Sequence, residues 1–145
     1  MLTKLKAKDI MRKFPAQLSP EDPAHWARTV MESHGVHHLP VTINGLLLGL
    51  VSRAESIAAT LSGRAGYLTA LEFMRKNPVR ASPDACLGEL SRALIAEGHD
   101  CIPIVSEHDE VLGAVHVHDV LRELYQYAGR VENVLLHPAW IPSAA

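Results

Sequence analysis

The chain has few aromatic side chains, few cysteines and little net charge. Aromatic residues make up 5% of its 145 residues while 48% are hydrophobic, so the core must consist mainly of Ala, Leu, Val and Ile. The two cysteines, Cys86 and Cys101, show neither a metal-ligand spacing nor the pattern of a disulfide framework. Fourteen Lys and Arg residues against sixteen Asp and Glu residues leave a net charge of −2, without a basic stripe. These absences argue against a nucleic-acid partner.

Long apolar runs and targeting signals are missing as well. The most apolar run, residues 46–51, is far too short to span a bilayer. Residues 1–11 are polar and do not contain the apolar core of a signal peptide. We therefore expect a cytoplasmic protein without membrane insertion. No Gly-x-Ser-x-Gly or catalytic cysteine signature is found, so the sequence does not predict an enzyme.

An internal repeat is the strongest positive signal. Residues 11–15 (MRKFP) return as residues 74–78 (MRKNP), an offset of 63 positions. The same offset relates residues 39–41 (LPV) to residues 102–104 (IPI), and a one-residue insertion then brings residues 49–51 (GLV) onto residues 113–115 (GAV). Two copies of one small unit are expected to stack and to bury surface that neither could bury alone.

Each copy shows the same order of helix, β-hairpin and helix. Gly35 and Gly98 follow the first helical pattern of their copies, and Asn44-Gly45 between two apolar runs is a strong hairpin signal. The sequence predicts an α+β protein with a first repeat at residues 6–61, a linker at 62–68, a second repeat at 69–128 and a C-terminal tail at 129–145.

This order of elements resembles that of the CBS domain. Leu39-Pro40-Val41 opens the hairpin, and residues 49–55 (GLVSRAE) close it with the Gly-x-Val-x-x-x-acid pattern. The tandem resembles a CBS pair, or Bateman module, over nearly the whole chain. The resemblance implies two pseudo-symmetric repeats packed through their small sheets, and a homodimer. It also implies a regulatory or sensor module whose cleft binds AMP, ADP, ATP or S-adenosylmethionine and passes the occupancy on through the dimer.

In the first copy, the resemblance assigns Ser52 to a phosphate or ribose contact and Glu55 to the ribose hydroxyls. Glu stands where the family usually has Asp, which displaces the carboxylate by one methylene. Ser-x-x-Glu at a helix start is also a capping box, which requires no ligand. Arg53 is a further cation that could reach a phosphate.

In the second copy, Asp119 matches the family's ribose-binding acid and His116 replaces its hydroxyl residue. His116 could donate a hydrogen bond to phosphate, more strongly when protonated. The alternative for Asp119 is that it only stabilises the dipole of the following helix from its first turn.

The residues before the hairpin differ between the copies. His37 and His38 precede Pro40 and resemble the family's phosphate-facing pattern, whereas the second copy has Asp100-Cys101, which would repel phosphate. We expect two unequal clefts and at most one good nucleotide site. The sequence does not tell which copy's strand faces the cleft of Asp119.

Two other functions remain open from the sequence. The departures at Glu55, His116 and Asp100 fit a ligand-free interaction or scaffold module. Nine histidines invite a divalent-metal sensor, with His116, His118 and Asp119 or the trio His34, His37 and His38 as ligands. Neither set has an established metal spacing, so no dedicated metal site is predicted. The regulated partner cannot be named.

Overall fold

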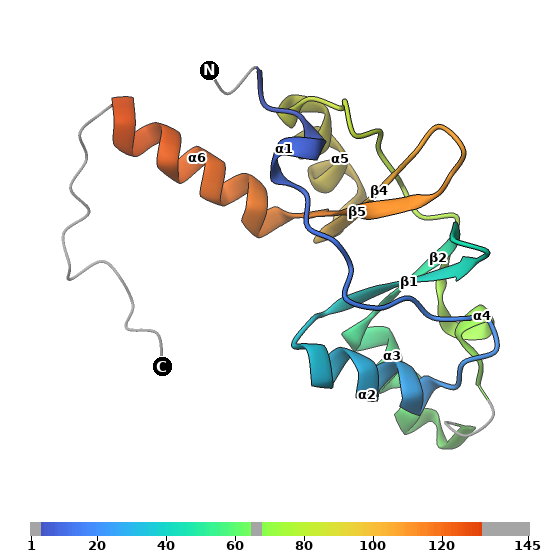
Figure 1. The fold of residues 1–145 in the computed structure, drawn as a ribbon. Coiled ribbons are helices and arrows are strands. Elements are labelled where there is room, and N and C mark those ends of the chain that lie inside the picture. Colours follow the sequence, from blue (N-terminus) through green and yellow to red (C-terminus); the bar gives the residue numbers. More distant parts are fainter. Residues whose placement is uncertain (1–3, 65–67, 132–145) are drawn as a thin grey trace, which may run out of the picture.

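The computed structural model describes residues 4–64 and 68–131, which form two lobes of similar build (Figure 1). One lobe contains, in chain order, α2 (Ala24–His34), β1 (His38–Ile43), β2 (Leu46–Ser52), α3 (Arg53–Ala59), the π-helical turn η2 (Thr60–Arg64), α4 (Ala70–Phe73) and β3 (Arg75–Lys76). The other contains α1 (Ala7–Ile10), α5 (Leu87–Glu97), β4 (Cys101–Val105), β5 (Val111–His116) and α6 (Val117–Val131). This arrangement confirms the α+β class.

Two predicted segments fall partly outside the described residues. They are positions 65–67 of the predicted linker and 132–145 of the predicted tail. The first three positions of that tail, 129–131, are the last turn of α6. Among the described residues, no helix is long and apolar enough to cross a membrane.

The helix ends and the hairpin turn lie where the local sequence signals predicted them. Gly35 adopts a left-handed conformation with φ of 64° and ends α2, and Gly98 ends α5 in the same way with φ of 61°. Asn44 and Gly45 have φ values of 52° and 81°, so both central residues of the β1–β2 turn are left-handed. Such a turn matches the twist of the two strands, and the predicted hairpin is confirmed.

The first segment of each repeat packs on the lobe of the other repeat (Figure 1). Ala7 of α1 is fully buried in the core formed by α5, β4 and β5, while Ala70 of α4 is fully buried in the core of α2, β1 and β2. The backbone hydrogen bonds are reciprocal. Ala7 N donates to Ala85 O at 2.8 Å, and at the equivalent positions Ala70 N donates to Asp22 O at 2.7 Å. The two repeats are thus joined by an exchange of segments.

Two glycines permit this exchange. A Cβ atom at Gly113 would lie 2.6 Å from the backbone oxygen of Arg12, and one at Gly49 would lie 2.9 Å from that of Arg75. Arg12 exchanges two backbone hydrogen bonds with Ala114 of β5, at 3.0 and 2.8 Å. The repeated glycine therefore fixes where the arginine of one repeat crosses the sheet of the other.

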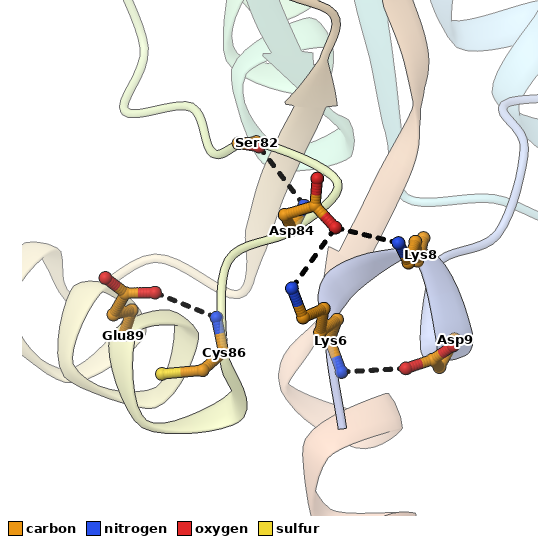
Figure 2. Close-up of polar contacts among 7 residues, drawn as sticks. All are labelled: Lys6, Lys8, Asp9, Ser82, Asp84, Cys86 and Glu89. Carbon is orange, nitrogen blue, oxygen red and sulfur yellow. Dashed lines mark hydrogen bonds and ion pairs between the residues drawn. The ribbon is translucent and has the colours of Figure 1, made fainter. Parts of the chain in front are cut away.

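Polar contacts secure α1 on the second lobe (Figure 2). The Asp84 carboxylate accepts hydrogen bonds from Lys8 at 2.8 Å and Lys6 at 3.3 Å. These pairs lower the pKa of Asp84, and the hydrogen bond with Asp84 raises that of Lys8. All three side chains are well exposed, so the apolar contacts of α1 contribute more to its attachment.

The two sheets meet along a small apolar contact between the lobes. Leu50 of β2 packs with Cys101 of β4 and Ala114 of β5, and Phe14 covers this cluster. The hairpin ends also pair, because Leu47 N donates to Asp109 O and Val111 N donates to Gly45 O. Packing through the small sheets, as the sequence predicted, is what leaves a cleft at the side of this contact.

Candidate functional site: a cleft between the repeats

A cleft of about 400 Å³ opens between the two lobes. It receives His37 and His38 from the start of β1, and His116 and Asp119 from the β5–α6 junction. The structure thereby brings together four residues that the sequence singled out separately. The lining also includes Arg12, Lys13, Phe14, Pro15, Gly35, Val36, Asp100, Ala114, Val117, His118 and Arg122. The sequence did not tell which copy's strand faces the cleft of Asp119. The strand of the first copy does, because His37 lines the same cleft as Asp119.

Asp119 is a buried carboxylate at the wall of the cleft, with 3% of its surface exposed. Its Oδ2 accepts a hydrogen bond from the backbone N–H of His116 at 2.9 Å, which closes the first turn of α6. Its Oδ1 lies 2.9 Å from Nε of Arg12 and 3.3 Å from a terminal nitrogen of Arg122. A buried carboxylate needs such partners, and here the partners come from both repeats.

The cleft carries more positive than negative charge. Arg12, Lys13 and Arg122 line it, against the carboxylates of Asp100 and Asp119. The side chains of Arg12 and Arg122 are 58% and 48% exposed, so each can leave Asp119 without opening the core. An anionic group entering the cleft would meet exposed guanidinium donors, which bind phosphate strongly.

Burial favours the neutral form of two histidines of the cleft, His38 and His116. Burial, reinforced by the nearby His116, lowers the pKa of His38 to about 4. Burial also lowers the pKa of His116, and the neighbouring Asp119 offsets this only in part. The sequence analysis expected a protonated His116 to donate to phosphate. His116 would be protonated near pH 7 only if the bound anion itself raised its pKa.

The remaining predicted site residues do not line this cleft. Ser52 and Glu55 form the capping box of α3, with Ser52 N donating to Glu55 at 2.8 Å and Glu55 N donating to the Ser52 hydroxyl at 3.1 Å. Arg53 is exposed at the first position of α3. Pro40 is buried, and its carbonyl accepts a hydrogen bond from Leu18 N. Their assignment to a nucleotide site stays a prediction.

Arg12 and Arg75 pair with the two candidate acids, although the sequence did not single them out. Arg75 lies 3.3 Å from Glu55, as Arg12 lies 2.9 Å from Asp119, so the arginine of each repeat pairs with the acid of the other. Both arginines belong to the repeated Met-Arg-Lys motif, which is visible in the sequence. Each arginine reaches the acid of the other repeat only because the segments are exchanged, and the motif within one repeat does not show this exchange.

The model of the CBS domain matches residues 7–55 and 70–126. The chain belongs to the CBS domain family, as a tandem pair. A relative of this CBS pair is the inosine-5′-monophosphate dehydrogenase of Korarchaeum cryptofilum, 33% identical over 117 residues. The match covers 80% of this chain but only 24% of that enzyme.

Solved CBS pairs share the fold. The pair of protein MJ0100, in complex with 5′-methylthioadenosine and S-adenosyl-L-methionine, matches with a TM-score of 0.77 and 22% identity, over 85% of this chain and 98% of that one. CBSX2 from Arabidopsis thaliana, in complex with AMP, matches with a TM-score of 0.75 and 18% identity, over 84% of this chain and 97% of its own. The resemblance seen in the sequence is confirmed at the level of the fold.

Proposed function

We propose that this CBS pair is a regulatory module that binds an adenosyl ligand in the cleft between its repeats and is not itself a catalyst. The observation that carries the proposal is Asp119, a buried carboxylate that lies between the exposed cations Arg12 and Arg122 on the wall of a cleft of about 400 Å³. That volume falls within the usual range of small-molecule sites. We place the module in the cytoplasm, where its free thiols at Cys86 and Cys101 would stay reduced.

The ligand would exchange places with the arginines. Its ribose hydroxyls would donate to the Asp119 carboxylate, which now binds Arg12 and Arg122. The released guanidinium groups would turn to the phosphates of AMP, ADP or ATP, or to the carboxylate of S-adenosylmethionine. Phe14, Val36 and Val117 supply apolar surface in the same cleft for the adenine base.

Two structural neighbours support the ligand class. CBSX2 binds AMP, and the MJ0100 pair binds 5′-methylthioadenosine and S-adenosyl-L-methionine. All of these ligands carry an adenosine group and differ in what is attached to it. The cations of this cleft favour a ligand with an anionic attachment, so we place AMP, ADP and ATP ahead of 5′-methylthioadenosine.

Occupancy would be transmitted through a homodimer. Helix α6 begins at the cleft, where Asp119 and Arg122 belong to its first turns, and it then extends away from the body of the molecule (Figure 1). Its Leu121 and Tyr125 are 54% and 60% exposed. A ligand that moves the first turns of α6 would therefore move an apolar surface that suits a second copy.

Ligand-induced stabilisation tests the proposal. A ligand present at 100 times its Kd stabilises the fold by about 2.7 kcal/mol, which should raise the melting temperature by roughly 5–10 °C. We expect this shift with at least one of AMP, ADP, ATP or S-adenosylmethionine. Asp119→Asn should lower the affinity at least tenfold in calorimetric titrations, because the amide loses a charged acceptor.

Glu55→Gln is the matched comparison, since Glu55 holds the equivalent position in the other repeat. A loss of affinity in Glu55→Gln but not in Asp119→Asn would move the site away from the cleft of Asp119 to the surroundings of Glu55. No shift with any adenosyl ligand, in protein shown to be free of bound nucleotide, would contradict the proposal and favour the scaffold alternative.

A further inference from the structure

A cluster of one thiol and two imidazoles lies where the two repeats meet. His38, Cys101 and His116 each offer a ligand atom, and these atoms lie within 4.8 Å of one another. Cys101 and His116 are register partners on β4 and β5, while His38 comes from β1 of the other repeat. Within the described parts of the chain, this is the one group of three such ligands, and it matches neither histidine set considered from the sequence.

The cluster contains an unsatisfied donor or acceptor. Nδ1 of His38 is buried and has no hydrogen-bond partner. Leaving a buried polar atom unpaired is energetically costly, so such an atom calls for an explanation. The His38 and His116 rings are 5.6 Å apart, and the thiol of Cys101 is 3% exposed beside them.

The surroundings of His116 resemble those of a metal-binding histidine. Its Nδ1 lies 3.6 Å from the Asp119 carboxylate. A carboxylate in this position orients the ring of a ligating histidine and makes its other nitrogen a better donor to the metal. Arg12 and Arg122 hold that carboxylate in place in turn.

We propose that His38, Cys101 and His116 bind a thiophilic divalent cation, with Zn²⁺ as the best match. Two imidazoles and one thiolate suit Zn²⁺, whereas Mg²⁺ and Ca²⁺ require oxygen ligands. Ligand atoms around tetrahedral Zn²⁺ are about 3.5 Å apart, so small side-chain rotations would close the present cluster on an ion.

The fourth coordination position would face the cleft. His38 and His116 line the cleft, whereas Cys101 lies behind them in the apolar contact between the sheets. Water, or an anionic group of a molecule in the cleft, would complete the tetrahedron. The site would also join the repeats, because its ligands come from both of them. Metal binding does not require the adenosyl ligand and is tested without it.

The cysteines provide a matched experiment with Co²⁺ as a spectroscopic probe for the Zn²⁺ site. Protein stripped with a chelator, in the absence of nucleotide, is titrated with Co²⁺ and then with Zn²⁺. We expect one Co²⁺ per chain with a thiolate-to-cobalt charge-transfer band, which Zn²⁺ abolishes and Mg²⁺ does not. Cys101→Ala should lose this band, and Cys86→Ala should keep it.

His38→Gln and His116→Gln keep the thiol and remove one imidazole each. Each should weaken Zn²⁺ binding at least tenfold in calorimetric titrations, and circular dichroism establishes that the variants are folded. A thiolate band that persists in Cys101→Ala, or stripped wild-type protein that takes up Co²⁺ without such a band, would overturn the proposal. If Cys101→Ala does not fold, unchanged Zn²⁺ affinity in both histidine variants would overturn it.

Discussion

His38, at the wall of the cleft, loses much of the hydration that its charged form needs. Its pKa is lowered to about 4 because burial disfavours the charged ring. The unfolded chain takes up that proton near pH 6.5, so between pH 6.5 and 4 the unfolded state binds more protons than the folded state. The contribution of His38 to stability is therefore complete above pH 6.5 and is lost as the pH falls towards 4.

We expect the free energy of unfolding of the metal-free protein to fall by about 1–2 kcal/mol between pH 7 and pH 5 through His38. The lowered pKa of His116 acts in the same direction. Urea denaturation at a series of pH values in the presence of a chelator measures the slope. His38→Gln should flatten it, and an equally steep slope in that variant would show that other groups cause the dependence.

At the residue scale, the sequence located part of the site. Asp119, His116, His37 and His38 were predicted one by one and line one cleft. Their meeting could not be predicted, because each copy has a hairpin and nothing within a copy shows which hairpin faces which acid. The sequence shows no metal-ligand spacing around Cys101, because its two histidine neighbours come from distant parts of the chain.

At the scale of elements, the exchanged segments hold the repeats together. The segment at residues 11–14 crosses β5 at Gly113, where the backbone oxygen of Arg12 leaves no room for a side chain. Arg12 reaches Asp119 from this crossing. The stability of the second lobe and the geometry of the cleft therefore depend on the same close contact.

Gly113→Ala should destabilise the protein by about 1–3 kcal/mol, because the new Cβ would lie 2.6 Å from the Arg12 oxygen and the segment would have to move. Gly88→Ala on α5 is the control, since its Cβ would have its nearest neighbour at 3.8 Å. The control should be neutral or stabilising by up to about 1 kcal/mol. Chemical denaturation compares the two, and equal stabilities would contradict the role given to Gly113.

The helices and hairpins themselves were well predicted from short-range signals. The left-handed glycines and the Asn44-Gly45 turn act over a few residues, so the sequence contains all that they need. The exchange was not predicted, because α1 and α4 arise from equivalent positions of the two repeats and could each pack on either lobe. The repeat boundaries at 6–61 and 69–128 stay a prediction, since the spatial lobes do not follow them.

At the scale of the whole molecule, α6 presents an apolar face that no other described segment covers. Val120 on its inner side is 5% exposed, whereas Leu121, Leu124 and Tyr125 are largely exposed. An apolar face of this kind on a helix that projects from the body suits association with a second copy.

The double variant Leu121→Glu/Leu124→Glu should convert the proposed dimer to a monomer, because each charge would be buried in the interface. Sedimentation equilibrium should give twice the chain mass for the wild type and the chain mass for the variant. Ile95→Glu, the same change at an exposed residue of α5, should leave the dimer intact. A wild-type protein that is monomeric at all concentrations would contradict the dimer.

The exchange of segments also has a consequence for synthesis on the ribosome. Residues 7–12 emerge first, but the strand and turn that they pair with, around residues 83–87 and 113–114, follow some 75 to 100 positions later. The first lobe likewise waits for Ala70 and Met74 before its core is closed. The first lobe can close its core once residues 70–76 have emerged, whereas the second lobe needs residues 111–120 as well, so the segment at residues 7–12 waits longest for its partners.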